Sequence, residues 1–317
     1  MPSLQETIVP APAKRVRRIT VLISGSGSNL QALLDAAGTP SLPNAAITHV
    51  ISSRSAAYGL TRARTANPPI PTSVCALKTF QNKNPGATRE DYDSEVARLV
   101  LDSKPDLIVL AGWMHILSDK FLRILSGEIE PPSKPALGPP QPASLPTQTE
   151  PIPSKSSGSD ATTTSSTSAT TELDASISKL SIQPNSEQST SAPQSQSTSE
   201  KEPDTSAKLP PAPETLHFPI PIINLHPALP GAFDGANAIG RAFDAFHAGQ
   251  VEGTGVMVHR VVAEVDRGEP LVVRKVEIKK EDKVEDLEAR IHEVEHQIIV
   301  EGAKLVLEEL DKEGLQS

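Results

Sequence analysis

Apolar residues in the first part of the chain form short runs separated by stretches with helical spacing. The runs are rich in Val, Ile and Leu and predict buried strands at residues 18–23, 47–52 and 106–110. The stretches between them predict amphipathic helices at residues 29–37, 58–66 and 89–103. Strands that alternate with helices indicate βαβ units, in which helices cover a parallel sheet.

The same pattern resumes near residue 218. Apolar runs predict strands at residues 221–225, 256–265 and 271–278, and the last two would form a hairpin-like pair around Asp266-Arg267-Gly268. Helical spacing predicts helices at residues 237–248 and 284–310. Neither block has enough strands to close a sheet around the other's helices. We therefore expect residues 18–126 and 218–312 to form one α/β domain, with a mostly parallel sheet and helices on both faces.

Residues 127–217, between the two blocks, have a different composition. They hold half of the chain's 30 prolines, contain no Phe, Tyr or Trp, and are dominated by Ser, Thr, Pro and Gln. Such a segment buries too little apolar surface to offset the entropy that its backbone would lose on ordering. We therefore expect a long disordered insertion at residues 127–217, and a flexible N-terminal tail at residues 1–17.

Composition and charge exclude several classes of protein. A formal net charge of −9 gives no global electrostatic support for nucleic-acid binding. The single cysteine, Cys75, permits neither an intrachain disulfide nor a cysteine-based metal site, which is typical of a reducing compartment. No apolar run is long enough to span a membrane, and the N-terminal residues lack the apolar core of a secretory signal. We expect a cytoplasmic protein with no metal, nucleic acid or membrane partner.

The segment Ser24 to Leu30, SGSGSNL, joins the first predicted strand to the first predicted helix. Glycines there allow a tight turn, and the first N–H groups of the helix can bind an anion. The segment departs from a dinucleotide-binding fingerprint, because Leu30 stands in place of the third glycine and Ser52-Ser53 stands where an acid would hold a ribose. It favours a monophosphate over NAD, and a tight turn that binds nothing is the structural alternative.

Candidate catalytic residues stand at the end of the strand at 221–225 and in the turn around Asp266. Asn224 and His226 are two positions apart, so an extended backbone directs both side chains to one face. In an acyl transfer, an amide can stabilise an oxyanion while an imidazole moves a proton. A carboxylate from Asp266, if held near His226, would favour the imidazolium and raise the pKa of His226. Taken singly, each of these residues is more often structural, in a helix cap or an ordinary turn.

A series of motifs, in chain order, resembles the phosphoribosylglycinamide formyltransferases. The motifs are VLISGSGSNLQALLDA (21–36), TREDYD (88–93), PDLIVLAGWMHILS (105–118), INLHPALPG (223–231), GTGVMVHRVVAEVDRGEPLV (253–272) and ARIHEVEH (289–296). They cover nearly the whole of the predicted domain, and the early Ser-Gly loop narrows the resemblance to the glycinamide branch of a wider superfamily. The segment after Pro230, GAFDGANAIGRAFDAF, is more similar to fungal, monofunctional members than to bacterial ones.

The resemblance implies a Rossmann-like formyltransferase fold and a reaction. The enzyme would transfer the formyl group of 10-formyltetrahydrofolate, its co-substrate, to the amine of 5-phosphoribosylglycinamide in de novo purine (IMP) biosynthesis, without a metal. Asn224, His226 and Asp266 would be the catalytic trio, supported by His259. The substrate-binding residues would be Gly27, Ser28, Asn29, Gly112, Pro227 and Glu295. The folate-binding residues would be Arg89, Met114, His115, Ile116, Leu117, Asn224 and Val265, with backbone from Val262 to Asp266 near the pterin.

Other functions stay open on the residues alone. Another folate-dependent formyltransferase, or a formyl-folate hydrolase, would share the trio but not the phosphate loop. A catalytically silent Rossmann-like binding module is disfavoured by the complete trio. An NAD-dependent oxidoreductase is disfavoured by Leu30 and by the missing acid after the second strand.

Overall fold

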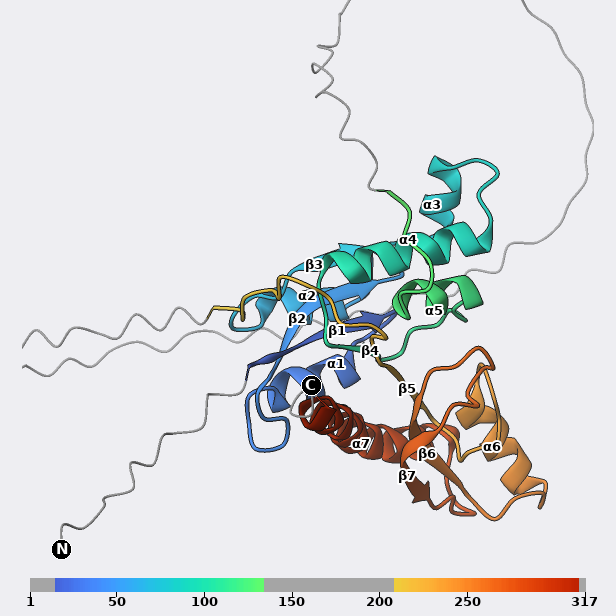
Figure 1. Ribbon diagram of the computed structural model, residues 1–317. Helices are drawn as coiled ribbons and strands as arrows, with labels where there is room; N and C mark the ends of the chain where they lie inside the picture. Colours follow the sequence, from blue (N-terminus) through green and yellow to red (C-terminus); the bar gives the residue numbers. More distant parts are fainter. Residues whose placement is uncertain (1–14, 134–207, 314–317) are drawn as a thin grey trace, which may run out of the picture. The chain divides into compact units, whose positions relative to one another are not determined.

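A seven-stranded sheet runs through the part of the chain that the computed structural model describes, residues 15–133 and 208–313 (Figure 1). The strand order is β3-β2-β1-β4-β5-β6-β7. The strands are β1 (Arg17–Ile23), β2 (Ala45–Ser52), β3 (Thr72–Val74), β4 (Leu107–Leu110), β5 (Ile222–His226), β6 (Thr254–Arg260) and β7 (Pro270–Val276). Strands β1 to β5 pair in parallel, whereas β6 and β7 pair antiparallel with their neighbours.

Helices lie on both faces of this sheet (Figure 1). They are α1 (Ser28–Ala36), α2 (Gly59–Thr65), α3 (Leu77–Lys83), α4 (Arg89–Asp102), α5 (Asp119–Leu125), α6 (Ala238–His247) and α7 (Val284–Glu313). One apolar cluster lies between the sheet and helices α1 and α7, and a second lies between the sheet and helices α4 and α5. Strand β1 serves both clusters, because Val21 faces the first and Leu22 the second. The predicted α/β fold is confirmed. None of the helices in the described ranges is long and apolar enough to cross a membrane.

The prediction missed three short elements. Strand β3 has three residues, and helices α3 and α5 have seven residues each. Elements of this length show few apolar repeats from which to establish a period, although the equally short α2 was predicted. The prediction also placed the first strand one residue late, because β1 begins at Arg17, inside the predicted tail.

The strand predicted at 256–265 is too long. Strand β6 ends at Arg260, so the connection to β7 is the loop at residues 261–269 and not a tight turn at 266–268. The loop folds back onto β6 so closely that a Cβ atom on Gly268 would lie 1.7 Å from Arg260 O. Only glycine leaves room for this approach. The loop carries Asp266 back toward the end of β5.

Residues at both ends of the predicted insertion pack on the domain. Ile129, Leu209 and Leu216 contact the apolar clusters. Arg18 Nη1 donates a hydrogen bond to Pro210 O at 2.6 Å, and Lys104 Nζ donates one to the backbone at Pro213 at 3.0 Å. Proline lacks a backbone N–H group but keeps its carbonyl oxygen, which can accept hydrogen bonds from such side chains. Amino-acid composition alone does not reveal these contacts. The remainder of the predicted insertion, residues 134–207, lies outside the described residues.

Candidate active site

A cavity of about 570 Å³ opens where β1, β4 and β5 end. Its lining includes residues at the carboxyl ends of these strands or just after them, in the ranges 25–29, 111–117 and 224–227. Open α/β sheets bind ligands outside the carboxyl ends of their strands, where the strand order reverses. Here the order reverses at β1, and the volume is in the range of small-molecule sites.

The loop between β1 and α1 forms one side of the cavity. Gly27 adopts φ +72°, and a Cβ atom on it would lie 2.6 Å from Gly59 Cα. Helix α2 supports the loop from behind, because Gly59 N–H donates to Gly25 O at 3.2 Å and Arg62 Nε–H donates to Ser26 O at 3.0 Å. Gly27 has no side chain to cap α1, and the first turn of α1 holds no acidic residue. The helix therefore presents its positive end to an anion.

Helix α7 adds carboxylates and an imidazole beside this loop. Asn29 Nδ2 donates a hydrogen bond of 3.1 Å to Glu295 Oε2. Burial raises the pKa of Glu295 above its ordinary value, and the hydrogen bond from Asn29 acts in the opposite direction. Glu288 and His292 also line the cavity, although the sequence analysis missed them. Their spacing relative to Glu295, i, i+4, i+7, places all three on one face of a helix and was an available signal.

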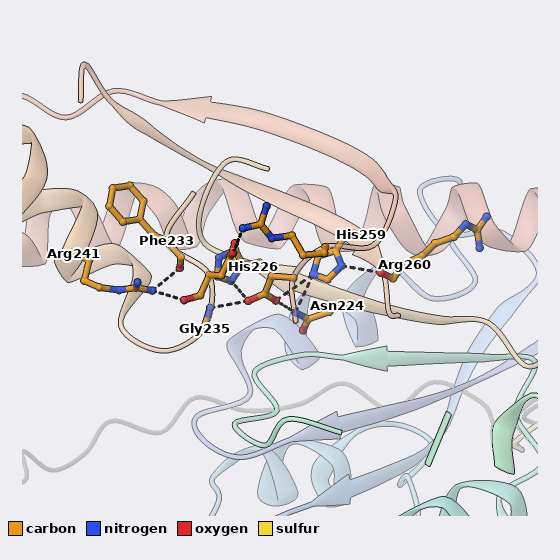
Figure 2. A network of polar contacts seen from close by, with 10 residues as sticks. Asn224, His226, Phe233, Gly235, Arg241, His259 and Arg260 are labelled. Carbon is orange, nitrogen blue, oxygen red and sulfur yellow. Dashed lines mark hydrogen bonds and ion pairs between the residues drawn. The ribbon is translucent and has the colours of Figure 1, made fainter. Parts of the chain in front are cut away.

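The predicted trio meets at the end of β5 (Figure 2). His226 Nδ1 lies 3.4 Å from Asp266 Oδ2, and Asn224 Nδ2 donates to Asp266 Oδ1 at 3.2 Å. Asn224 and His226 therefore direct their side chains to the same face, as their spacing predicted. His259, opposite Asn224 on β6, joins the cluster, because its Nε2 atom lies 3.2 Å from Asn224 Nδ2. Its Nδ1 atom lies 2.8 Å from Arg260 O.

The contacts of His259 depend on whether its Nε2 atom carries a proton. In the neutral ring with the proton on Nδ1, Nδ1 donates to Arg260 O and Nε2 accepts from Asn224, whereas in the charged ring Nε2 can donate toward Asp266 Oδ1, 3.4 Å away. With the neutral ring, Asn224 has acceptors for both amide hydrogens, at His259 Nε2 and at Asp266 Oδ1. It must release one of them before it can donate to a ligand.

The expected effect of Asp266 on His226 is only partly correct. Burial lowers the pKa of His226 below 6.5, and it outweighs the nearby Asp266 carboxylate and a backbone hydrogen bond with Ala232, which both raise it. Asp266 thus raises the pKa of His226, as expected, but the net pKa lies below the ordinary value. The imidazole is buried at the cavity wall. Loss of hydration there destabilises the imidazolium by more than the Asp266 carboxylate stabilises it. His226 is thus neutral at neutral pH, and its Nε2 atom has no hydrogen-bond partner within the described protein.

Asp266 is held as a carboxylate by several donors. Burial alone raises the pKa of Asp266, but hydrogen bonds with His259 and from Gly235 N–H, together with the charges of His226 and His259, bring it below the ordinary value. The Gly235 N–H group donates to Oδ2 at 2.9 Å. Asp266 itself adopts φ +55°, a left-handed conformation that aspartate tolerates better than most residues.

The predicted folate-binding segment after β4 forms another wall of the cavity. Met114 and Ile116 are 67% and 66% exposed, so they are not core residues, whereas Leu117 is buried. Arg89 does not line the cavity. It supports the segment from α4 instead, because Arg89 Nη2 donates to Ile116 O at 2.6 Å and Arg89 Nε to Asp93 Oδ1 at 3.0 Å.

All other predicted site residues line the cavity: Gly27, Ser28, Asn29, Gly112, Met114, His115, Ile116, Leu117, Asn224, His226, Pro227, Val265, Asp266 and Glu295. Trp113 and the segment 235–239 also contribute to the lining, although no sequence pattern assigned them to a site. Trp113 Nε1 is buried and has no hydrogen-bond partner among the described residues. No sequence pattern distinguished Trp113 from a core residue. Among residues 15–133 and 208–313, no three His, Cys, Asp or Glu side chains are grouped to hold a metal ion.

Comparisons with known proteins agree with this geometry. The family model of the formyl transferases matches residues 17–129 and 207–302. A phosphoribosylglycinamide formyltransferase of Schizosaccharomyces pombe is 34% identical over 294 residues, which cover 92% of this chain and 98% of that protein. The enzyme of the same name from Saccharomyces cerevisiae is 35% identical over 93% of this chain and 99% of that protein. This chain belongs to the phosphoribosylglycinamide formyltransferase family.

Solved structures of the phosphoribosylglycinamide formyltransferase family share the fold. Glycinamide ribonucleotide transformylase 1 from Symbiobacterium toebii superimposes with a TM-score of 0.56, at 26% identity, over 92% of this chain and 88% of that chain. The two stretches matched by the formyl transferase model leave residues 130–206 unmatched, where the sequence analysis placed an insertion. Similarity to the fungal members, predicted from the segment after Pro230, is confirmed by the two yeast relatives.

Proposed function

We propose that this chain transfers the formyl group of 10-formyltetrahydrofolate to the amine of 5-phosphoribosylglycinamide in purine biosynthesis. One observation carries the proposal: a single cavity is lined both by the open N-terminus of α1 and by Asn224, His226 and Asp266. The helix end suits the phosphate of the ribonucleotide, and the trio suits acyl transfer. A formyl-folate hydrolase needs only the trio.

The chemistry starts from neutral His226. As the amine nitrogen of the glycinamide forms a bond to the formyl carbon, the carbonyl electron pair moves to the oxygen. Asn224 releases Asp266 or His259 and donates to this oxyanion. His226 takes the proton from the amine, and the adjacent Asp266 carboxylate stabilises the imidazolium that forms.

Collapse of the tetrahedral intermediate completes the transfer. The oxyanion re-forms the carbonyl group, the bond between the formyl carbon and the folate nitrogen breaks, and the imidazolium of His226 returns its proton to that nitrogen. His226 ends neutral, as it began. The low pKa that burial gives His226 favours this return, because the buried imidazolium is a stronger acid than one in water.

The remaining site residues have proposed roles in binding. Gly27, Ser28 and Asn29 would hold the phosphate, and Glu295 would contact the ribose or the glycinamide. Met114 to Leu117, with Val265, would contact the folate, and Arg89 would act through the backbone of Ile116. The proposed reaction uses no metal, because Asn224 stabilises the oxyanion and His226 carries the proton. A cytoplasmic location is part of the proposal, supported by the single thiol.

A spectrophotometric transfer assay tests the proposed function. Purified protein is mixed with 10-formyltetrahydrofolate, with and without 5-phosphoribosylglycinamide, and loss of the formyl group is followed. Deformylation that requires the glycinamide, that persists in excess EDTA and that is lost in Asp266→Asn is the expected result. Deformylation without the glycinamide would identify a hydrolase. Absence of deformylation in a folded sample would indicate a silent binding module.

A further inference from the structure

The loop at residues 231–237 is attached to the loop that carries Asp266 by two adjacent contacts. Gly235 N–H donates to Asp266 Oδ2 at 2.9 Å, and Arg267 Nη2 donates to Asp234 Oδ2 at 2.5 Å. Two consecutive residues of one loop thus meet two consecutive residues of the other. The first of these contacts reaches a member of the trio directly.

Arg241 holds the same loop from its other side (Figure 2). Its Nη2 atom donates to Phe233 O at 2.5 Å and to Asp234 O at 2.8 Å, and its guanidinium lies 5.9 Å from the centroid of the Phe233 ring. Phe233 adopts φ +53°, an unfavourable left-handed conformation for an aromatic residue. The loop therefore depends on an external contact, and Arg241, from helix α6, provides it. Arg241 does not line the cavity.

The Asp234-Gly235 peptide links Arg241 to Asp266. Its carbonyl group accepts from Arg241, and its N–H group donates to Asp266. A trans peptide is planar, and its C=O and N–H bonds point in opposite directions. Fixing the carbonyl on Arg241 therefore fixes the direction of the N–H bond. If this peptide rotated, its carbonyl oxygen would face the carboxylate of Asp266 and repel it.

We propose that Arg241 is a positioning residue for Asp266, acting through the Asp234-Gly235 peptide. The proposal rests on the proposed formyl transfer, in which Asp266 must be a correctly oriented carboxylate. The Arg241 guanidinium donates to the carbonyl of the peptide whose N–H group donates to Asp266, so the cation polarises that peptide. Such polarisation strengthens both hydrogen bonds of the peptide.

The charged and polar groups around Asp266 determine how the loss of Arg241 would change the pKa of Asp266. His226 faces Asp266 from β5, His259 faces it from β6, and the Asn224 amide also donates to it. The neighbouring cation of Arg267 is engaged by Asp234. Gly235 N–H is thus the only backbone donor to Asp266 found within the described residues, and its loss would raise the pKa of Asp266.

Arg241→Ala tests the proposal, with Arg274→Ala as the matched control. Arg274, like Arg241, is exposed, but it pairs with Glu301 away from the cavity. We expect kcat of Arg241→Ala to fall about tenfold, as for loss of one hydrogen bond to a charged group, with KM for both substrates nearly unchanged. The titration midpoint of the Asp266 carboxyl group, followed by NMR, should move upward by about one pH unit. Added ethylguanidinium should restore part of kcat in Arg241→Ala, whereas Arg274→Ala should match the wild type in all three measurements.

An unchanged kcat in Arg241→Ala, or a lower kcat with an unchanged titration midpoint of Asp266 and no rescue, would overturn the proposal. If Arg241→Ala does not fold, Arg241→Gln, which keeps an amide donor, is judged by the same criteria. An NMR titration of the Asp266 carboxyl carbon in wild type and variant is independent of turnover. It decides the positioning role even if the wild type proves inactive, which would refute only the proposed function. Equal titration midpoints in the two proteins would again reject the role of Arg241.

Discussion

Asn29 and Glu295 are joined by a hydrogen bond of 3.1 Å, although 266 residues of sequence separate them. The bond connects the first turn of α1 to α7 across the cavity lining. Glu295 is only 6% exposed, and Asn29 Oδ1 has no hydrogen-bond partner in the described part of the chain. Asn29 Oδ1 can therefore still accept a hydrogen bond from a hydroxyl or amine group of a ligand in the cavity.

Glu295→Gln should weaken binding of the phosphoribosylglycinamide selectively. We expect KM for this substrate to rise about tenfold, because a charge-assisted hydrogen bond is replaced by a neutral one. KM for 10-formyltetrahydrofolate should stay unchanged. The control is Glu301→Gln, an exposed position on the same helix. Steady-state kinetics with each substrate varied in turn measure the effect, and equal increases in both KM values would contradict the assignment.

Gly27→Ala should destabilise the protein more than Gly38→Ala. Both glycines have similar positive φ values, +72° and +76°, so both substitutions incur about 1–2 kcal/mol of backbone strain. Only at Gly27 does the added Cβ collide with a backbone, that of Gly59, whereas Gly38 has open space. Urea unfolding of the two variants compares the losses. Equal free energies of unfolding would show that the loop moves away from α2 at little cost.

The stability of the protein should fall between pH 7 and pH 5. His226 has a folded-state pKa below the unfolded value of 6.5, so below that pH the unfolded chain binds a proton that the folded chain does not. The contribution of His226 to the free energy of unfolding is therefore complete above pH 6.5 and is lost as the pH falls toward the folded pKa. The slope that His226 alone contributes is at most about 1.4 kcal/mol per pH unit.

Urea titrations at several pH values between 5 and 7.5 measure this slope. His226→Asn should reduce it, but not abolish it, because burial also lowers the pKa values of His49, His115 and His296. The exposed His247 provides the control, since His247→Asn removes an imidazole without removing a buried one. A slope that is the same in His226→Asn and in the wild type would refute the burial argument.

Cys75 should be unreactive in the folded protein. Burial is the main cause that raises the pKa of its thiol to about 12, with the neighbouring Glu95 carboxylate contributing. Thiolate, the reactive form, is therefore scarce at pH 8. Since it is the only cysteine, a thiol reagent reports on it alone. Modification should be slow in the native protein and fast in denaturant, and rapid modification of the native protein would contradict the assigned burial.

Local spacing explains which parts of the site could be predicted. Asn224 and His226 share a face because a strand alternates with period two, and this holds wherever the strand lies. The turn at Gly27 and the helix that follows are likewise fixed by neighbours in the sequence. The strands and long helices follow the same logic, because their apolar periods are long enough to be recognised.

Contacts between distant segments explain what could not be predicted. Asp234 and Arg267 pair, and Gly235 donates to Asp266, only because two loops meet in space. The proline-rich ends of the presumed insertion pack on the domain through Arg18 and through apolar contacts that composition conceals. Neither relationship leaves a period or a motif in the sequence.

By itself, the sequence determined the α/β architecture and the glycine turn before α1, and its motifs indicated the candidate trio through their family resemblance, because periodicity and short motifs are properties of neighbouring residues. Only the tertiary structure decided that His226 is neutral and that Arg241 reaches Asp266 through a peptide. The sign of the pKa shift of His226 is set by the balance of desolvation against one carboxylate. That balance depends on how many atoms surround the imidazole, and the number is fixed only when strand, loop and helix come together.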